Sequence, residues 1–240
     1  MAAERLQKLL AAAGVCSRRR AEELLRDRRV QINGCVAALG DRADPLCDRI
    51  CVDGRDIAAA PPPLVLLLNK PPGVLCSCRD PQGRPTVLDL LPPALRQGQG
   101  LHPVGRLDRD SRGALLLSNA GALTLRLTHP RYGHRKTYRV WVAGRPSPAA
   151  LARWRDGVPL DGRPSQPVQI QLLRQQPDRC LLQLQLREGR NRQIRRTAEL
   201  LGHPVLDLQR RAIGDLQLAD LPEGRWRQLQ PQEWMPWMAL

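Results

Sequence analysis

The chain has 240 residues, and 38 Lys and Arg residues against 23 Asp and Glu residues give it a formal net charge of +15. This excess of positive charge favours an anionic partner such as nucleic acid, whose phosphates bind Lys and Arg. The longest aliphatic run, Leu64 to Leu68, is far too short to span a membrane, and the start shows no apolar signal region. These features exclude a membrane-spanning protein, and we expect a soluble cytoplasmic one with no membrane partner.

The seven Cys residues do not have the spacing of a metal site. Two close pairs occur, Cys47 with Cys51 and Cys76 with Cys78, but no second matching pair and no His stands at ligand spacing. We expect reduced thiols and no bound metal.

Two short helices are predicted at the start of the chain. Apolar residues recur at helical spacing from Leu6 to Ala13, Gly14 ends this helix, and Ser17 can cap a second one. The second helix begins with Arg18-Arg19-Arg20, although a helix dipole favours anions at this end. Phosphate groups approaching the helix start would meet both the arginines and the free backbone donors.

Small strands follow, and a proline run then ends the module. Strands are expected over 30–32 and 49–52, each followed by a turn, at Asn33-Gly34 and at Asp53-Gly54. The sequence Ala58-Ala59-Ala60-Pro61-Pro62-Pro63 predicts a stiff spacer. We therefore expect two domains, residues 1–60 and residues 61–240.

The first sixty residues resemble the S4 RNA-binding domain over their whole length. The matching stretches are Arg5 to Leu10, Gly14, Ser17 to Arg19, Ala21, Val30 to Gly34 and Ile50 to Gly54. Arg29 departs from this pattern, because the family commonly has Gly before the strand. The resemblance implies RNA contacts from Arg5, Lys8, Ser17, Arg18, Arg19, Arg20 and Asn33.

After the spacer, a buried strand is predicted over 66–70, followed by a turn through Gly73 and a short helix near 84–92. The next feature is Asp108, which lies in the basic loop 105–113 before an apolar run. Three arginines within four residues of Asp108 favour the ionised form of its carboxyl group. Such a carboxylate suits a nucleophile or base acting on nucleic acid, although an exposed ion pair would have the same sequence pattern.

A strand with alternating apolar residues is predicted over 137–142. It places Tyr138, Val140 and Val142 on one face. Tyr138 is either a core residue or a platform on which an extruded base can stack.

The second basic cluster covers 187–196 and leads into a helix that Gly202 ends. Asn191 is the expected N-cap. The apolar face of this helix places Arg195 at its edge, where the arginine could lean into a site. A half-buried arginine needs a carboxylate partner, and Asp108 is the candidate.

These motifs, in this order, resemble the RsuA/RluB family of ribosomal RNA pseudouridine synthases. They are Asn69-Lys70-Pro71-x-Gly73, Gly105-Arg106-Leu107-Asp108, Gly113, Leu115 to Leu117, Asn119, Gly121, Lys136-x-Tyr138, Glu188 to Arg196, Gly202 to Val205 and Arg211-x-Ile213-Gly214. The chain departs from the family at Ala114, Ala120 and Thr197, none of which removes a group that the reaction needs.

The resemblance implies an α+β fold. A small N-terminal S4 (αL) domain would precede a catalytic domain built on a long mixed, largely antiparallel sheet, with the active cleft across its middle. It also implies conversion of uridine to pseudouridine without a cofactor or metal.

By the same resemblance, the catalytic residues are Asp108, Tyr138 and Arg195. Asp108 starts the reaction, Tyr138 stacks on the flipped uracil, and Arg195 pairs with Asp108. Further RNA contacts are expected from Lys70, Arg106, Arg190, Asn191, Arg192, Gln193 and Arg196. Whether Asp108 attacks C6, attacks C1′ or removes the 2′ proton stays open.

Motifs near 136–147 and 156–163 resemble the branch of the family that modifies the large subunit, which favours 23S over 16S rRNA. The expected partner is this RNA, alone or in a pre-ribosomal particle, and the expected state is a monomer. Two other functions remain, a non-catalytic ribosome-assembly factor and a metal-dependent nuclease. The first has no need for Asp108, Tyr138 and Arg195 together, and the second would require more clustered carboxylates.

Overall fold

A computed structural model describes residues 3–239 of the chain. Helices α1 (Leu6–Ala12) and α2 (Arg18–Arg26) form where their apolar spacing predicts them. Gly14 follows the first helix with a φ of +73°, and the Ser17 hydroxyl accepts a hydrogen bond of 3.2 Å from the backbone N–H of Arg20. The predicted helix end and N-cap are thus confirmed.

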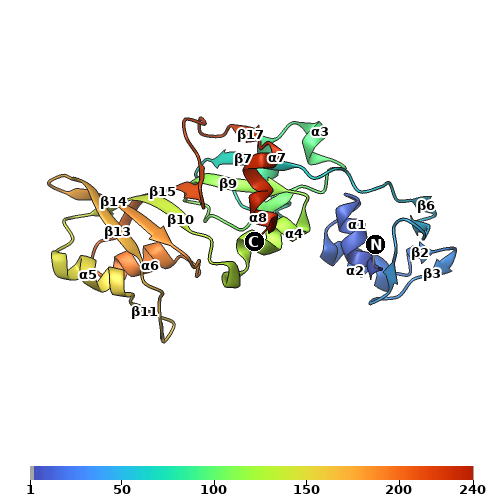
Figure 1. Ribbon diagram of the computed structural model, residues 1–240, viewed down its shortest axis with the longest axis horizontal. Coiled ribbons are helices and arrows are strands. Elements are labelled where there is room, and N and C mark those ends of the chain that lie inside the picture. The colour runs from blue at the N-terminus through green and yellow to red at the C-terminus, as the bar shows by residue number, and fades with distance from the viewer. Residues whose placement is uncertain (1–2, 240) are drawn as a thin grey trace.

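Around these helices lie six short strands. They are β1 (Glu4–Arg5), β2 (Val30–Ile32), β3 (Cys35–Val36), β4 (Arg42–Ala43), β5 (Ile50–Val52) and β6 (Arg55–Asp56). Strands β3-β2-β5-β6 form one sheet, and β1 pairs with β4. One hydrophobic cluster, drawn only from residues between Leu6 and Ile57, holds this module together. The module lies at one end of the molecule, joined by an extended segment (Figure 1).

A nine-stranded sheet is the central element of the remaining chain. Its strands are β7 (Val65–Lys70), β8 (His102–Val104), β9 (Arg112–Ser118), β10 (Lys136–Ala143), β13 (Gln169–Gln175), β14 (Arg179–Leu186), β15 (Val205–Ile213), β16 (Leu216–Gln217) and β17 (Trp226–Gln228). The main order is β13-β14-β10-β15-β9-β7-β17, and every pairing is antiparallel except that of β9 with β15. The α+β class and the long mixed sheet are confirmed.

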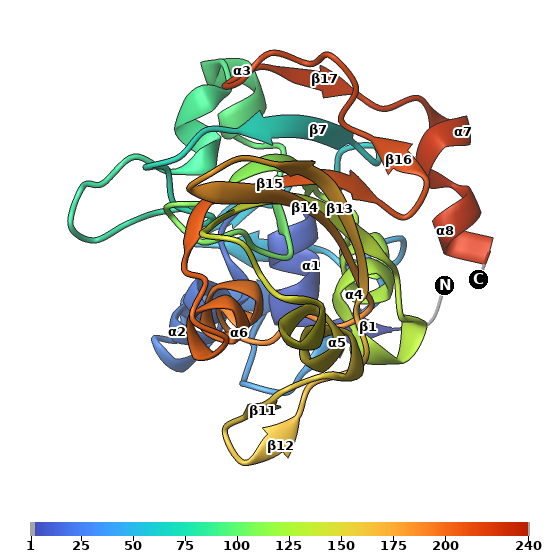
Figure 2. The same cartoon turned by 90° about the vertical axis from the view of Figure 1, so that its left-hand side faces the viewer.

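Helices and a small hairpin cover this sheet. They are the 3-10 helices η1 (Val87–Leu90) and η2 (Pro130–Tyr132), the α-helices α3 (Pro93–Arg96), α4 (Gly121–Thr128), α5 (Pro148–Asp156), α6 (Gln193–Leu200), α7 (Pro231–Trp234) and α8 (Pro236–Ala239), and the hairpin β11 (Pro159–Leu160) with β12 (Arg163–Pro164). Figure 1 and Figure 2 place α5 and α6 on one side of β13 and β14. Buried Trp154 of α5 and Ala198 of α6 share a hydrophobic cluster with Val140 and Leu182 of the strands. None of the helices between residues 3 and 239 is long and apolar enough to cross a membrane.

The two halves of the sheet meet where β9 runs parallel to β15. Only Arg112 and Gly113 of β9 pair there, with Gln209 and Arg210. Gly113 has a φ of +108°, and a Cβ atom on it would lie 2.2 Å from the carbonyl oxygen of Arg210. Because only glycine permits this approach, Gly113 fixes the junction just after the Asp108 loop.

Candidate active site

Lys70, at the end of β7, anchors the loop that carries Asp108. The Lys70 side chain is fully buried, and its Nζ donates to the carbonyl oxygens of Pro71 (2.9 Å), Arg109 (3.3 Å) and Ser111 (2.7 Å). Burial lowers the pKa of this ammonium group. The predicted RNA contact of Lys70 is therefore wrong, because the side chain anchors the loop and does not reach the surface.

A pocket of about 110 Å³ brings the predicted catalytic residues together. Asp108, Tyr138 and Arg195 all line it, and they come from the loop before β9, from β10 and from α6. Leu107, Leu186 and Leu208 supply an apolar part of the wall. A pocket with a carboxylate, an aromatic ring and an arginine at an apolar wall can hold a small planar base.

The arginine partners in this pocket differ from those predicted. Arg195 Nε lies 3.3 Å from Oδ2 of Asp110, and its Nη2 donates to the Asp110 carbonyl (3.1 Å) and to Ser111 Oγ (3.3 Å). Arg192 reaches Asp108 instead, with 3.5 Å between Nη1 and Oδ2, and also lies 3.2 Å from Asp110. Two arginines and two carboxylates thus form one charged group in place of the single expected pair.

The start of α6 explains this exchange. Arg192, not Asn191, is the N-cap residue, and it has a left-handed conformation with φ of +46°. Its side chain makes no cap hydrogen bond and pairs with the carboxylates of the Asp108 loop instead. Arg195, three residues further on, forms its ion pair with Asp110.

Of the two carboxylates in this charged group, Asp110 contacts both arginines. Burial acts to raise the pKa of Asp110, but the hydrogen bond from Arg192 and the charge of Arg195 outweigh it, and the pKa falls below its usual value. Asp110 therefore stays ionised and keeps both arginines beside the loop.

Tyr138 lies between two hydrophobic clusters of the sheet. Its ring packs against both clusters, and its backbone stands opposite Leu184 on one side and Arg210 on the other. The ring also lines two cavities, the catalytic pocket and a second one beside it. The predicted platform position is thus available to a base in the catalytic pocket.

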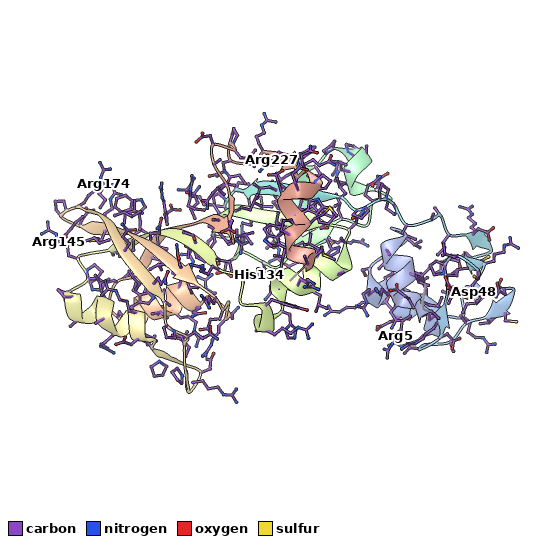
Figure 3. All side chains as sticks on the ribbon, viewed as in Figure 1. Arg5, Asp48, His134, Arg145, Arg174 and Arg227 are labelled. Atoms are coloured by element: carbon purple, nitrogen blue, oxygen red, sulfur yellow. The ribbon has the colours of Figure 1, made fainter. Side chains whose placement is uncertain are left out.

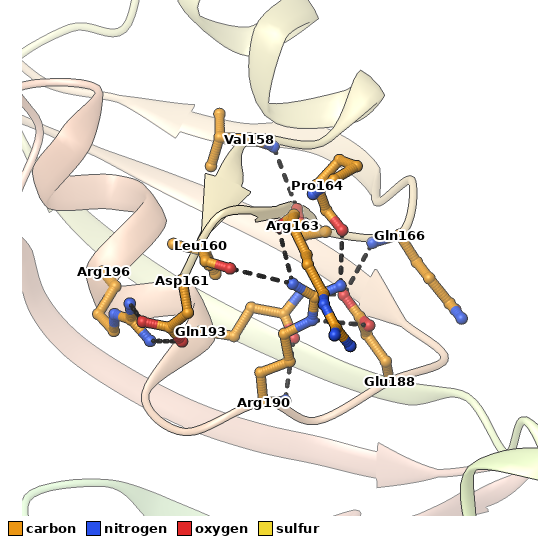
Figure 4. Close-up of polar contacts among 11 residues, drawn as sticks. Val158, Leu160, Asp161, Arg163, Pro164, Gln166, Glu188, Arg190, Gln193 and Arg196 are labelled. Atoms are coloured by element: carbon orange, nitrogen blue, oxygen red, sulfur yellow. Dashed lines mark hydrogen bonds and ion pairs between the residues drawn. The ribbon is translucent and has the colours of Figure 1, made fainter.

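Three further residues predicted to bind RNA have intramolecular partners. Arg190 donates to the carbonyl oxygens of Leu160, Arg163 and Pro164 in the β11–β12 hairpin and to Glu188, as Figure 4 shows.

Buried Gln193 donates to Glu188 Oε1 at 2.7 Å and accepts from the backbone N–H of Arg190. Arg196 forms a bidentate pair with Asp161 at 2.6 and 2.9 Å (Figure 4). These side chains position the hairpin beside the pocket, whereas Arg106 and Asn191 stay exposed.

The N-terminal module carries a basic groove of about 460 Å³. Arg5, Lys8 and Arg18 line it, together with Arg42, which sequence reasoning missed. Arg5 is labelled in this part of the molecule in Figure 3. Arg42 lies in no basic run, so only its pairing with Arg5 across β1 and β4 places it here.

The remaining residues predicted in this module lie outside the groove lining. Arg20 pairs with Glu23 at 2.7 Å, and the Asn33 side chain bonds to Asp48 and to the backbone of Arg49. Ser17 caps α2, and Arg19 is exposed.

Comparison with known proteins agrees with this description. Residues 64–200 match the model of the RNA pseudouridylate synthase family, and residues 4–50 match the S4 domain. The chain is 39% identical to ribosomal large subunit pseudouridine synthase B of Bacillus subtilis, over 96% of this chain and 93% of that protein. It is 40% identical to the protein of the same name from Pseudomonas aeruginosa, over 96% of this chain and 60% of that protein. A solved structure of a pseudouridylate synthase superposes with a TM-score of 0.70 at 30% identity, covering 97% of this chain and 99% of that one.

Proposed function

Because this chain belongs to the RNA pseudouridylate synthase family and carries an N-terminal S4 domain, we propose that it converts uridine to pseudouridine in the ribosomal RNA of the large subunit. The reaction is an isomerisation. The bond between N1 and C1′ breaks, the uracil turns, and C5 joins C1′, so no atom is gained or lost. The observation that carries the proposal is the single pocket that holds Asp108, Tyr138 and Arg195.

Each side chain in the pocket has a task that its position supports. Asp108 acts on the uridine as nucleophile or base, since it is a half-buried carboxylate of the pocket lining whose ion pair within residues 3–239 is with Arg192. Arg192 and Arg195, held by Asp110, place two guanidinium groups beside the Asp108 loop. Tyr138 stacks against the uracil.

The target base must leave its helix to reach this pocket. An enzyme cannot act on a base inside a stack, so the nucleotide is extruded first. Exposed Arg106, at the rim of the pocket, is placed to fill the gap that the base leaves in the RNA.

The substrate is supported by the relatives and by charge. Two relatives are named for the large subunit, and the basic groove of residues 1–60 provides a second RNA contact away from the pocket. We propose that the enzyme works as a monomer in the cytoplasm; Asp108, Tyr138 and Arg195 of one chain already meet in the pocket, so the proposed reaction needs no second copy. Naked RNA and a pre-ribosomal particle are both candidate forms of the substrate.

The test replaces Asp108 with Asn and uses Asp110→Asn as the matched control. Both variants lose one negative charge from the same loop, so both should bind RNA within a few-fold of wild type. The proteins are incubated with 23S transcript, 16S transcript and immature large subunits, and pseudouridine is mapped by carbodiimide modification and primer extension.

We expect a stop at one uridine in 23S RNA for wild type, a weaker stop for Asp110→Asn and none for Asp108→Asn. A stop in 16S RNA alone would reassign the substrate. Activity in Asp108→Asn would remove Asp108 from the mechanism, and a large loss of RNA affinity would give it a structural role.

A further inference from the structure

A second cavity, of about 180 Å³, lies directly beside the catalytic pocket. The two share Arg106, Tyr138, Glu188 and Gly189 in their walls. The floor of the second cavity is apolar, with Val104, Leu116, Leu127 and Ile213, and its other walls are basic. The proposed reaction uses none of the basic groups that are particular to this cavity.

The first of these groups is Arg210 of β15. Its side chain is 4% exposed, Nε donates to the carbonyl oxygen of Ala114 at 2.6 Å, and Nη1 lies 3.5 Å from the carbonyl of Arg106. Nη2 is buried without a hydrogen-bond partner, and no carboxylate within residues 3–239 forms an ion pair with this guanidinium. Burying a cation without a counter-charge costs free energy. An anion from outside the protein would therefore be a favourable partner for Arg210.

Other basic groups face the same space. Lys136 and Arg187 line the cavity, as does His134, whose Nε2 is buried without a partner. Burial and then the charge of Arg210 lower the pKa of Lys136. His134 lies at the edge of the middle part of the molecule in Figure 3.

The one carboxylate in the cavity wall is already engaged. Glu188 accepts hydrogen bonds from Gln193 (2.7 Å), from the backbone N–H of Gln166 (2.8 Å) and from Arg190 (3.2 Å). It is turned into the hairpin network of Figure 4 and so does not neutralise Arg210 or Lys136. The cavity is therefore cationic, and the unpaired Nη2 of Arg210 is a hydrogen-bond donor.

We propose that this cavity is a subsite for a phosphodiester group of the RNA strand next to the extruded nucleotide. The inference rests on the proposed function, because the extruded uridine in the first pocket brings the flanking phosphate to the second. A phosphate offers several acceptor oxygens and a negative charge, which a guanidinium and an ammonium bind with charge-assisted hydrogen bonds. Tyr138 and Arg106 form the wall between base and phosphate.

Two variants test the subsite. Lys136→Gln removes a charge inside the cavity, and Arg187→Gln removes one at its exposed rim, where folding is not at risk. Arg139→Gln is the control, because it changes the same charge on the same strand as Lys136, is exposed and does not line the cavity. Circular dichroism melts establish that each variant folds.

Binding to 23S transcript is measured at several salt concentrations. We expect Lys136→Gln and Arg187→Gln each to lower the affinity about tenfold and to reduce the slope of log K against log salt by about 0.7 to 0.9. Arg139→Gln should stay within about twofold of wild type. At saturating RNA the single-turnover rate of the control Arg139→Gln should match wild type, because Arg139 lies outside both cavities.

A second arm uses a short stem-loop around the mapped uridine, with one neutral methylphosphonate next to it. At one of the two flanking positions the neutral group should weaken wild type about tenfold and weaken Lys136→Gln by less, because Arg210 and Arg187 still line the cavity of that variant. Equal affinity and slope for Lys136→Gln, Arg187→Gln and Arg139→Gln would overturn the subsite. A changed slope together with no pseudouridine from wild type in any RNA would overturn the proposed function and leave the anion subsite standing.

Discussion

Lys70 shows how a single buried charge can fix the loop that carries Asp108. Lys70→Met keeps most of the apolar stem but leaves the carbonyls of Pro71 and Ser111 without their donor, whereas the Arg109 carbonyl keeps a hydrogen bond from the Gly73 N–H. Because each buried carbonyl left unpaired costs about 1–3 kcal/mol, we expect a loss of about 2–4 kcal/mol in the free energy of unfolding and a lower turnover rate. Urea denaturation and single-turnover assays measure both. The control Lys8→Met, at an exposed position, should leave the free energy of unfolding unchanged. A Lys70→Met variant as stable as wild type would mean that Lys70 does not stabilise the loop.

Asp80 provides a pH test. Its carboxylate accepts from the side chain and backbone of Arg84, which lowers the pKa of Asp80 to about 2. Since this pKa lies below the ordinary value of 3.8, the unfolded chain binds the proton first as pH falls. The stabilisation is therefore present above about pH 4 and is lost as pH falls through about 2. An NMR titration of Asp80 should show this midpoint, Arg84→Gln should raise it, and Arg79→Gln should not. An unchanged midpoint in Arg84→Gln would refute the assigned cause.

The motifs predicted which residues meet in the pocket, but not how their charges pair. Asp108, Tyr138 and Arg195 reach one pocket because the loop before β9, the strand β10 and the helix α6 that carry them all belong to one sheet or pack on it. The partner of Arg195 depends on the left-handed N-cap at Arg192, and the burial of Lys70 depends on strand pairing far along the chain. Neither is visible in a local pattern. Arg210 shows the same limit, because only the folded sheet removes it from solvent.

The junction of β9 and β15 is the most constrained contact between elements. Gly113→Ala would place a Cβ 2.2 Å from the Arg210 carbonyl at a φ of +108°. We expect a loss of about 3 kcal/mol or more in the free energy of unfolding, because backbone strain and steric overlap add. The control Gly162→Ala shares a positive φ of +73° but has nothing within 4 Å, so it should lose only about 1–2 kcal/mol. Thermal or urea unfolding measures the difference. Equal losses of stability in the two variants would mean that the backbone at the junction can move to accept the extra Cβ.

Elements with a clear local pattern were predicted from the sequence, including the short strands β2 and β5, whereas the long strands β13, β14 and β15 were not. Strand β7 is buried at all six positions and β10 alternates, so each carries its own signal. Strands such as β1 and β16 have two residues and exist only because a distant partner pairs with them. The parallel pairing of β9 with β15 likewise has no local pattern. Sequence periodicity therefore predicts individual strands such as β7 and β10, and tertiary contacts decide which strands pair.

Across the whole molecule, positive charge is unevenly distributed. Residues 1–60 contain 11 of the 38 Lys and Arg residues and 9 of the 23 Asp and Glu residues, so most of the net charge lies in the rest of the chain. The contribution of the N-terminal module to RNA binding must then come from where its basic residues lie and not from its net charge. Its basic groove provides that arrangement, since Arg5, Lys8, Arg18 and Arg42 gather there.

Deleting residues 1–60 should therefore weaken RNA binding without abolishing it. The groove is lost, whereas the basic surface around the catalytic pocket remains. We expect the slope of log K against log salt to fall by about two to three, as for three or four lost phosphate contacts. Filter binding to 23S transcript over a range of salt measures this slope.

A triple variant, Arg5, Lys8 and Arg18 to Gln, should reproduce most of the effect in the full chain. A control triple, Arg26, Arg28 and Arg55 to Gln, removes the same charge outside the groove and should have a much smaller effect. Equal effects of the two triples would mean that the module binds through overall charge alone. Unchanged binding after deletion would remove it from RNA recognition altogether, and the catalytic domain would then select the substrate by itself.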